Sequence, residues 1–205
     1  MRRFRLTRLK GNVFVFKGDE RESLKYQEEA ILIAEEINDL RLISTSLNNL
    51  AERYRILGDL DQALIYGKRC ITFYNKFLSN KSVVGLAFGL STTLDIALEM
   101  GNIELAKSCL LRLEQLNNQE ENELIDLFYR EGYAYVLKSS PRLRNRVKAE
   151  DILRKIIEEH VIHFESSVKA LINLCELLLS ELQITKDSEI LEEIQLLITR
   201  LSDMA

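Results

Sequence analysis

The stretch "NNLAERYRILGDLDQALIY", from Asn48 to Tyr66, contains the feature that decides the fold. A run with helical apolar spacing stops at Gly58 and Asp59, and a second such run starts at once. Glycine reaches the left-handed conformation that ends a helix at little cost, and an aspartate after it can cap the next helix. The stretch therefore predicts two helices joined by a tight reversal.

The same reversal recurs along the chain. It appears in "KGDERESLKYQEEAI", "LGDLDQALIYGKRCI" and "MGNIELAKSCLLRL", and the turn glycines Gly18, Gly58 and Gly101 are 40 and 43 residues apart. A looser fourth copy places the turn at Ser139, where the insertion "SPRLRNR" lengthens it before Ala149. A single helical hairpin cannot bury its own apolar face, so we expect these hairpins to stack on one another.

Small and aromatic residues recur at fixed positions around each turn. Such residues let two antiparallel helices approach closely and fill the space between hairpins. With them the sequence resembles the tetratricopeptide repeat (TPR) family, in a long-unit variant similar to the helical-repeat arms of signalling and transcription-activator ATPases. The residues that carry the resemblance are Gly11, Phe14, Gly18 and Ala30 in the first unit and Ala51, Tyr54, Gly58 and Ala63 in the second.

The expected fold is all-α, a right-handed αα-superhelix of about five hairpins, in other words a TPR-like solenoid. One proline and eight glycines in 205 residues suit long helices. "NVFVF" at 12–16 alternates with period two, but its place in the first unit predicts a helix. We expect a single domain over 1–205, with hairpins at approximately 3–38, 41–79, 83–117, 121–160 and 164–203.

Composition limits the classes of function. The formal net charge of -4 argues against a dedicated nucleic-acid binder, whose domain is usually strongly basic. Cys70, Cys109 and Cys175 lie in apolar helical patterns and form no close pair, which is typical of buried, reduced thiols in a cytoplasmic protein. No apolar run approaches the ~20 residues that span a bilayer, so we expect no membrane partner.

The TPR resemblance implies that the first helix of each hairpin lines a concave groove. Asparagine amides there can bond a bound peptide's main chain, and arginine can hold a carboxylate. A carboxylate clamp would be incomplete, because Phe88 and Thr92 stand where cations are needed. A solvated polar face, with the aromatic residues packed in the core, is the alternative. The expected groove residues are Arg8, Asn12, Asn48, Asn49, Glu52, Arg55, Asp95, Tyr129 and Tyr133.

Charge is unevenly distributed in the second half of the chain. Residues 138–155 contain seven basic and two acidic residues, whereas 158–205 contain ten acidic and three basic ones. A basic loop beside an acidic end can recruit RNA or an acidic partner, or join copies head to tail; the alternative is a solvated loop. The predicted basic patch consists of Arg142, Arg144, Arg146 and Lys148.

The sequence nominates no catalytic set. His160 and His163 are the only histidines, and no cysteine or third histidine is close in sequence, so we read them as surface or junction residues rather than metal ligands. Gly85 and Gly89 stand in "VVGLAFGLS", which lacks the lysine and hydroxyl of a phosphate-binding loop. We therefore expect no enzyme, no metal and no cofactor.

The favoured function is a non-enzymatic protein–protein interaction scaffold that binds a peptide or helix in the concave groove. One alternative is a regulatory or sensor arm of a larger signalling or transcription regulator, and another is RNA binding through residues 138–155. The C-terminal stretch "ILEEIQLLITRLSDMA" keeps apolar residues where a terminal repeat normally shows a polar face. Self-association through the terminal hairpins is therefore a further expectation, unless the chain is a piece of a longer array.

Overall fold

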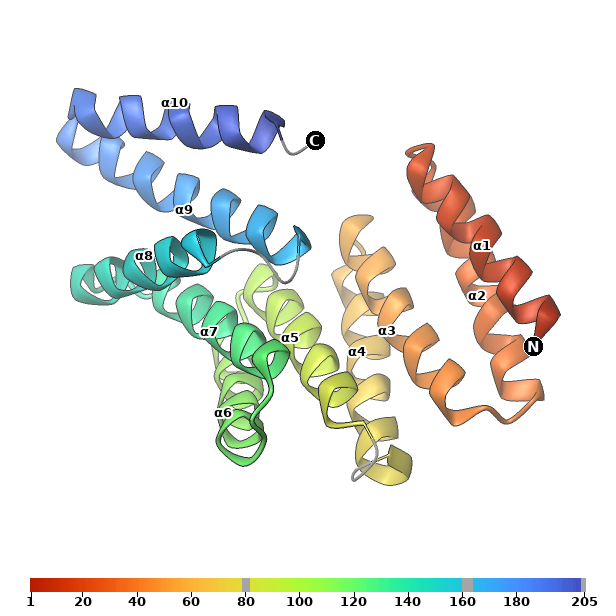
Figure 1. Ribbon diagram of the computed structural model, residues 1–205. Coiled ribbons are helices and arrows are strands. Elements are labelled where there is room, and N and C mark those ends of the chain that lie inside the picture. The colour runs from red at the N-terminus through yellow and green to blue at the C-terminus, as the bar shows by residue number, and fades with distance from the viewer. Residues whose placement is uncertain (79–81, 160–163, 204–205) are drawn as a thin grey trace. The chain divides into compact units, whose positions relative to one another are not determined.

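A computed structural model describes residues 1–78, 82–159 and 164–203, and these residues form α-helices joined by short turns (Figure 1). The all-α expectation is confirmed for them, including the helical assignment of residues 12–16. The helices are α1 (Arg2–Phe16), α2 (Glu20–Glu36), α3 (Leu40–Ile56), α4 (Leu60–Phe73), α5 (Val83–Glu99), α6 (Ile103–Gln119), α7 (Glu123–Lys138), α8 (Leu143–Glu158), α9 (Phe164–Thr185) and α10 (Ser188–Asp203). A π-helical turn, Tyr74–Leu78, continues α4.

The chain divides into two compact units, Met1–Glu121 and Asn122–Ala205. In the first unit each helix packs against the next from α1 to α6, and the first helices α3 and α5 of two successive hairpins also contact each other. In the second unit α7 packs on α8, α8 on α9 and α9 on α10, with a further contact between α7 and α9. The predicted single array over 1–205 stays a prediction.

The turns inside the first three hairpins have the predicted chemistry. Gly18, Gly58 and Gly101 have φ of 72°, 78° and 69°, a left-handed conformation that residues with a Cβ seldom adopt. The next residue caps the following helix in each case; Asp59 Oδ1, for example, accepts a hydrogen bond from the Gln62 backbone N–H at 3.1 Å. These local interactions fix where each helix ends and the next begins.

The fourth turn differs from its prediction. We expected the insertion at 140–146 to lengthen the turn before Ala149, whereas α8 already begins at Leu143. The Asn145 side-chain amide donates to Ser140 Oγ at 2.8 Å, and the Asn145 N–H donates to the Arg142 carbonyl at 2.9 Å. These bonds close a first helical turn inside the insertion, so only Ser139–Arg142 remain as the connection.

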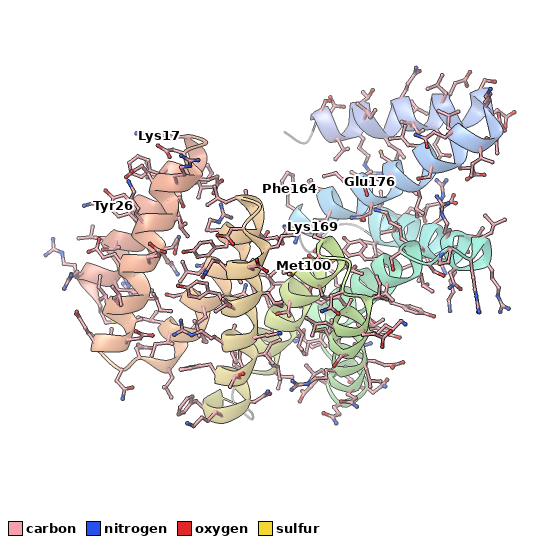
Figure 2. All side chains as sticks on the ribbon, turned by 180° about the vertical axis from the view of Figure 1, so that it is seen from behind. Lys17, Tyr26, Met100, Phe164, Lys169 and Glu176 are labelled. Carbon is pink, nitrogen blue, oxygen red and sulfur yellow. The ribbon has the colours of Figure 1, made fainter. Side chains whose placement is uncertain are left out.

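Small residues and aromatic pairs hold the first unit together, as predicted. Ala51, Ala63 and Ile96 are fully buried in one cluster against Tyr54 and Tyr66. The rings of Tyr54 and Tyr66 stack with centroids 5.3 Å apart. In the first hairpin the rings of Phe14 and Tyr26 stack at 5.5 Å; Tyr26 is labelled in Figure 2. The three cysteines are buried and free, in agreement with the expectation of reduced thiols.

Candidate functional site

The predicted groove residues of the first unit lie on α1, α3 and α5, the first helices of their hairpins. Arg8 and Asn12 are exposed on α1. On α3, Asn49 is half-buried, but Asn48 is only 4% exposed. Sequence reasoning placed Asn48 and Asn49 side by side as ligand contacts, and the structure separates them into a buried and an accessible amide.

Asn48 occupies an unusual place for an amide. Neither its Nδ2 nor its Oδ1 has a hydrogen-bond partner among the described residues. Its Oδ1 lies where α3, α4 and α5 meet, because a methyl group placed on Gly89 of α5 would lie 3.8 Å from Asn48 Oδ1 and 3.3 Å from Sγ of Cys70 on α4. An unsatisfied buried polar group in a native structure calls for an explanation, such as a water or a ligand.

Arg55 is held by its own chain. Its guanidinium forms two hydrogen bonds to the Glu52 carboxylate, at 2.7 and 3.0 Å, and a third to Glu99 of α5. Burial lowers the pKa of Arg55, but the hydrogen bond to Glu52 and the charges of Glu52, Asp95 and Glu99 outweigh burial and raise that pKa. The expected peptide-binding arginine therefore ties α3 to α5, and the Asp95 charge belongs to the same cluster.

Tyr129 and Tyr133 lie on α7, in the second unit. Their rings stack with centroids 5.9 Å apart. Lys148 of α8 places its Nζ 4.8 Å from the centre of the Tyr133 ring and donates a hydrogen bond to Tyr133 Oη at 2.7 Å. These three residues form a cluster of their own, in which one predicted patch lysine serves to hold α8 on α7.

The basic segment is less available than its charge suggests. Besides Lys148, Arg154 is engaged, because its guanidinium pairs with Glu150 at 2.7 Å and with Glu193 of α10. Arg142 and Arg144 are exposed, and Arg146 is half-buried. Among the described residues, Arg142, Arg144 and Arg146 have no ion-pair partner, so they form the accessible part of the predicted basic patch.

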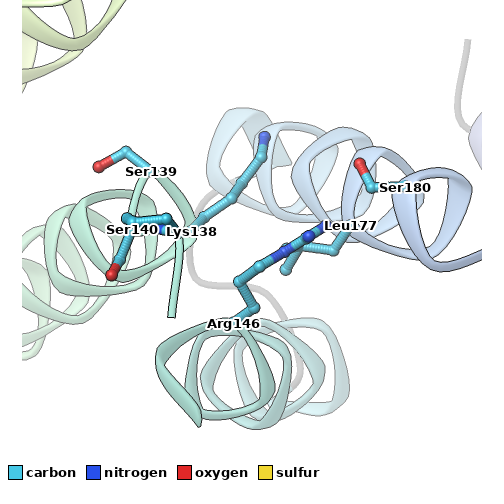
Figure 3. Close-up of a pocket in the computed structure, with 7 residues that line it drawn as sticks. Lys138, Ser139, Ser140, Arg146, Leu177 and Ser180 are labelled. Atoms are coloured by element: carbon cyan, nitrogen blue, oxygen red, sulfur yellow. The ribbon is translucent and has the colours of Figure 1, made fainter. Parts of the chain in front are cut away.

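A surface pocket of about 310 Å³ lies beside this patch in the second unit. Figure 3 shows Arg146 extending from α8 toward Leu177 of α9, with Lys138 and the serines around the same space. Lys138 Nζ donates to Asn173 Oδ1 at 2.7 Å and to the Glu176 carboxylate. Lys138, one of the two basic side chains that line the pocket, is thus paired with a carboxylate of the same chain. The lining residues are Lys138, Ser139, Ser140, Pro141, Arg146, Leu177 and Ser180.

The candidate metal ligands His160 and His163 lie outside the described residues. Within the described ranges, no three His, Cys, Asp or Glu side chains are placed to hold a metal ion together. A search of the same ranges finds no helix whose length and apolar character would let it cross a membrane.

Sequence reasoning missed an apolar row on α1. Leu6, Leu9, Val13 and Phe16 are 51%, 59%, 42% and 92% exposed. The helix was read through its polar residues Arg8 and Asn12, whereas the alternate three- and four-residue spacing of the apolar ones is the signal of a second face. We call these four residues the α1 row.

The comparisons with known proteins agree with this architecture. Residues 3–76 match the family model of the tetratricopeptide repeat. That match lies within the first unit, and the chain as described has the all-α fold of TPR-like repeat proteins.

Two solved structures show the likeness along the chain. TPR-like repeats of a Podosopora anserina protein assigned as a kinesin light chain superpose with a TM-score of 0.59 at 14% identity, covering 97% of this chain and 96% of that one. A tetratricopeptide repeat protein of Parabacteroides merdae gives 0.51 at 16% identity, covering 100% and 77%. At such identities the likeness concerns the fold alone. A search of curated protein sequences finds no match.

Proposed function

We propose that the protein is a non-enzymatic interaction module, and that its first unit binds a peptide or helix of a partner protein along α3 and α5. TPR repeats commonly mediate protein–protein interaction, and proteins of this family are typically scaffolds rather than enzymes. The direct contact between the two first helices α3 and α5 supports this choice, because it places their side chains on adjoining surfaces.

The buried amide of Asn48 is the observation that carries the proposal. A polar group left buried and unpaired costs about 1–3 kcal/mol of stability. A peptide main chain offers both an N–H for Oδ1 and a carbonyl for Nδ2. A ligand group that reaches into the junction of α3 and α5 would satisfy both atoms and offset that cost.

The ion-paired cluster of Arg55, Glu52 and Glu99 has a structural role. Arg55 is committed to Glu52 and Glu99, so it fixes the geometry of the face and is a positioning residue. Rigid helices lose little conformational entropy when a ligand binds, which favours affinity. Asn48 and the half-buried Asn49 are therefore the residues whose replacement tests contact with the ligand.

The experiment compares stability and affinity for Asn48→Leu. Peptides are first selected from a phage-displayed random library on the intact protein. Leucine has a similar size and no polar atoms, so we expect the variant to be more stable in urea by about 1 kcal/mol. The same variant should bind the selected peptides at least ~10-fold more weakly, which corresponds to about 1.4 kcal/mol.

Asn49→Ala should weaken the same peptides with little change in stability. The matched control is Gln115→Ala, an exposed amide on the second helix α6, which should leave affinity unchanged. Equal affinity of wild type, Asn48→Leu and Asn49→Ala for every selected peptide would place the binding surface elsewhere. A library that yields no binding peptide would count against peptide recognition altogether.

The two alternatives stay predictions of the sequence. A regulatory arm of a larger regulator would use the same kind of surface, and the length of the parent gene would distinguish it. RNA binding would depend on Arg142, Arg144 and Arg146, and its affinity should fall steeply between two salt concentrations. Lys138 and Arg154 are paired with carboxylates of the chain and Lys148 contacts Tyr133, so fewer cations of this segment are free to contact phosphates.

A further inference from the structure

The α1 row forms a face of its own on the first helix. The helix packs on α2 through the buried residues Phe4, Thr7 and Gly11. Leu6, Leu9, Val13 and Phe16 follow at steps of three, four and three residues, which places them along one side of a helix. Four exposed large apolar side chains in a continuous row are typical of an interaction surface rather than of solvated helix.

The repeat itself shows what kind of element covers such a face. The turn glycines set the register, so moving 40 and then 43 residues along the chain reaches the equivalent positions on α3 and α5. Leu6 corresponds to Ser46 on α3, which is 2% exposed. Leu9 and Val13 correspond to the half-buried Asn49 and Arg53 on α3, and to Thr92 and Ile96 on α5, which are 4% and 0% exposed. Phe16 corresponds to Ile56 on α3, which is 48% exposed, so the positions that become covered are those of Leu6, Leu9 and Val13.

The covering element is the second helix of the preceding hairpin. A methyl group on Gly67 of α4 would lie 2.7 Å from Thr93 Oγ1 and 3.8 Å from Ile96 Cδ1 of α5. The helix α2 packs on α3 in the same order along the chain. The natural occupant of the α1 row is therefore the second helix of another TPR-like hairpin.

The last helix of the chain has the surface that such an occupant needs. The helix α10 is a second helix, and it packs on α9 through the buried Ile194. Leu191 and Ile198 remain 44% and 51% exposed. They are seven residues apart and so lie on the same side of α10.

Charge favours the same pairing. Residues 2–17 contain six basic side chains and no acidic one. Arg2 and Arg5 lie four residues before Leu6 and Leu9 and are exposed, with no ion-pair partner among the described residues. The helix α10 contains four acidic side chains and one basic one, and its exposed Glu189 and Glu192 lie on the side of Leu196. The opposite net charges of the two helices steer their association, and the apolar faces decide which sides dock.

We propose that the α1 row docks on the Leu191–Ile198 side of α10 from a second copy of the chain, so that copies associate head to tail. The contact is heterologous, because it joins the α1 surface of one copy to the α10 surface of the next. Heterologous contacts build open chains or closed rings. This proposal uses neither Asn48 nor the α3–α5 face, so it stands or falls independently of the peptide-binding function.

Sedimentation velocity of the intact protein over a wide concentration range tests the association. We expect wild type to form dimers and larger species as its concentration rises. Leu9→Glu should weaken association at least ~10-fold, because a charge would have to be buried. The matched control is Leu32→Glu on α2, which has the same 59% exposure and should associate like wild type. Wild type that remains monomeric throughout would overturn the proposal.

Mixing two variants tests whether α10 is the helix that covers the α1 row. Ile198→Glu should weaken association as Leu9→Glu does, whereas Leu196→Glu, on the opposite side of α10, should not. Leu9→Glu and Ile198→Glu each keep one intact surface, so a mixture should form a one-to-one dimer that neither variant forms alone. Circular dichroism checks that both remain folded. If Ile198→Glu alone still associates like wild type, the α1 row does not dock on α10 and the proposal is wrong.

Discussion

The helices α1 and α5 hold the same place in their repeats, yet their equivalent faces differ in burial. Leu9 and Val13 of α1 are 59% and 42% exposed, whereas Thr92 and Ile96 of α5 are 4% and 0% exposed. Thr92 is more polar than Leu9, yet Thr92 is the buried residue of these two equivalent positions. The difference teaches that a neighbouring hairpin, and not the residue type alone, decides burial in a repeat protein, since each face is completed by the hairpin before it.

The largest expected effect on stability concerns the buried face of α5. Ile96→Ala should lower the free energy of unfolding by about 2–5 kcal/mol, because it leaves a cavity at the junction of α4 and α5. Val13→Ala, at the equivalent position of α1, should change it by less than about 0.5 kcal/mol in a monomeric sample. Urea unfolding followed by circular dichroism measures both. Equal losses would mean that the α1 row is already covered within the chain.

The second effect is a dependence of stability on pH, and it comes from Cys70 at the junction of α4 and α5. Burial raises the pKa of the Cys70 thiol to about 12, whereas the thiol of the unfolded chain ionises near its ordinary value of about 9. Burial of the neutral Cys70 thiol therefore contributes fully to stability below about pH 9. That contribution is lost as the pH rises toward 12, because the thiol ionises more readily in the unfolded chain. Between pH 8 and pH 10 the loss should be about 1.4 kcal/mol.

Cys70→Ala isolates that contribution. Other groups also titrate in this range, so the measurement is the difference between wild type and the variant in urea unfolding at pH 8 and pH 10. The variant should lose less stability than wild type over this interval. Parallel losses in the two proteins would show that the thiol at the junction is accessible to solvent in the folded state.

The third effect tests how closely α4 and α5 approach. A Cβ on Gly67 would lie 2.7 Å from Thr93 Oγ1, so Gly67→Ala should cost about 1 kcal/mol even after alanine's better helix propensity is included. In a Thr93→Ala background the oxygen is absent, and the same change should become stabilising. A double-mutant cycle in urea measures this reversal of sign, and simple additivity would contradict the contact.

The smallest effect compares two turns. Asp59→Ala removes the hydrogen bond that caps α4 and should cost about 0.5–1 kcal/mol. Arg142 holds the equivalent position before α8 but makes no side-chain cap, so Arg142→Ala should change stability by less than about 0.5 kcal/mol. Thermal unfolding of the two variants side by side checks the contrast. A larger loss for Arg142→Ala would assign that arginine a structural role in the fourth turn.

The sequence predicted what depends on local chemistry. The reversals at Gly18, Gly58 and Gly101 follow from positive φ and from a capping side chain, and both requirements are visible in the residues themselves. The helical assignment of 12–16 succeeded because the repeat register outweighed a short alternating pattern. The late start predicted for α8 was wrong because the Ser140–Asn145 hydrogen bond depends on how the insertion folds back.

The candidate site was less predictable because it depends on neighbouring helices. A polar residue at a first-helix position can point to solvent, as Asn12 does, or into the junction with the next hairpin, as Asn48 does. Spacing alone does not distinguish these cases. Arg55 reads as a free cation until Glu99, 44 residues further on, is known to lie beside it.

Site-directed crosslinking tests the central claim, that an uncovered first-helix face accepts a second helix, most directly. A mixture of Leu9→Cys and Ile198→Cys proteins is oxidised mildly, while Cys70, Cys109 and Cys175 stay protected by burial. We expect disulfide-linked dimers that contain one copy of each variant, and none from a mixture of Leu32→Cys with Leu196→Cys. Dimers formed only between two Leu9→Cys copies, or equal crosslinking in both mixtures, would contradict the claim.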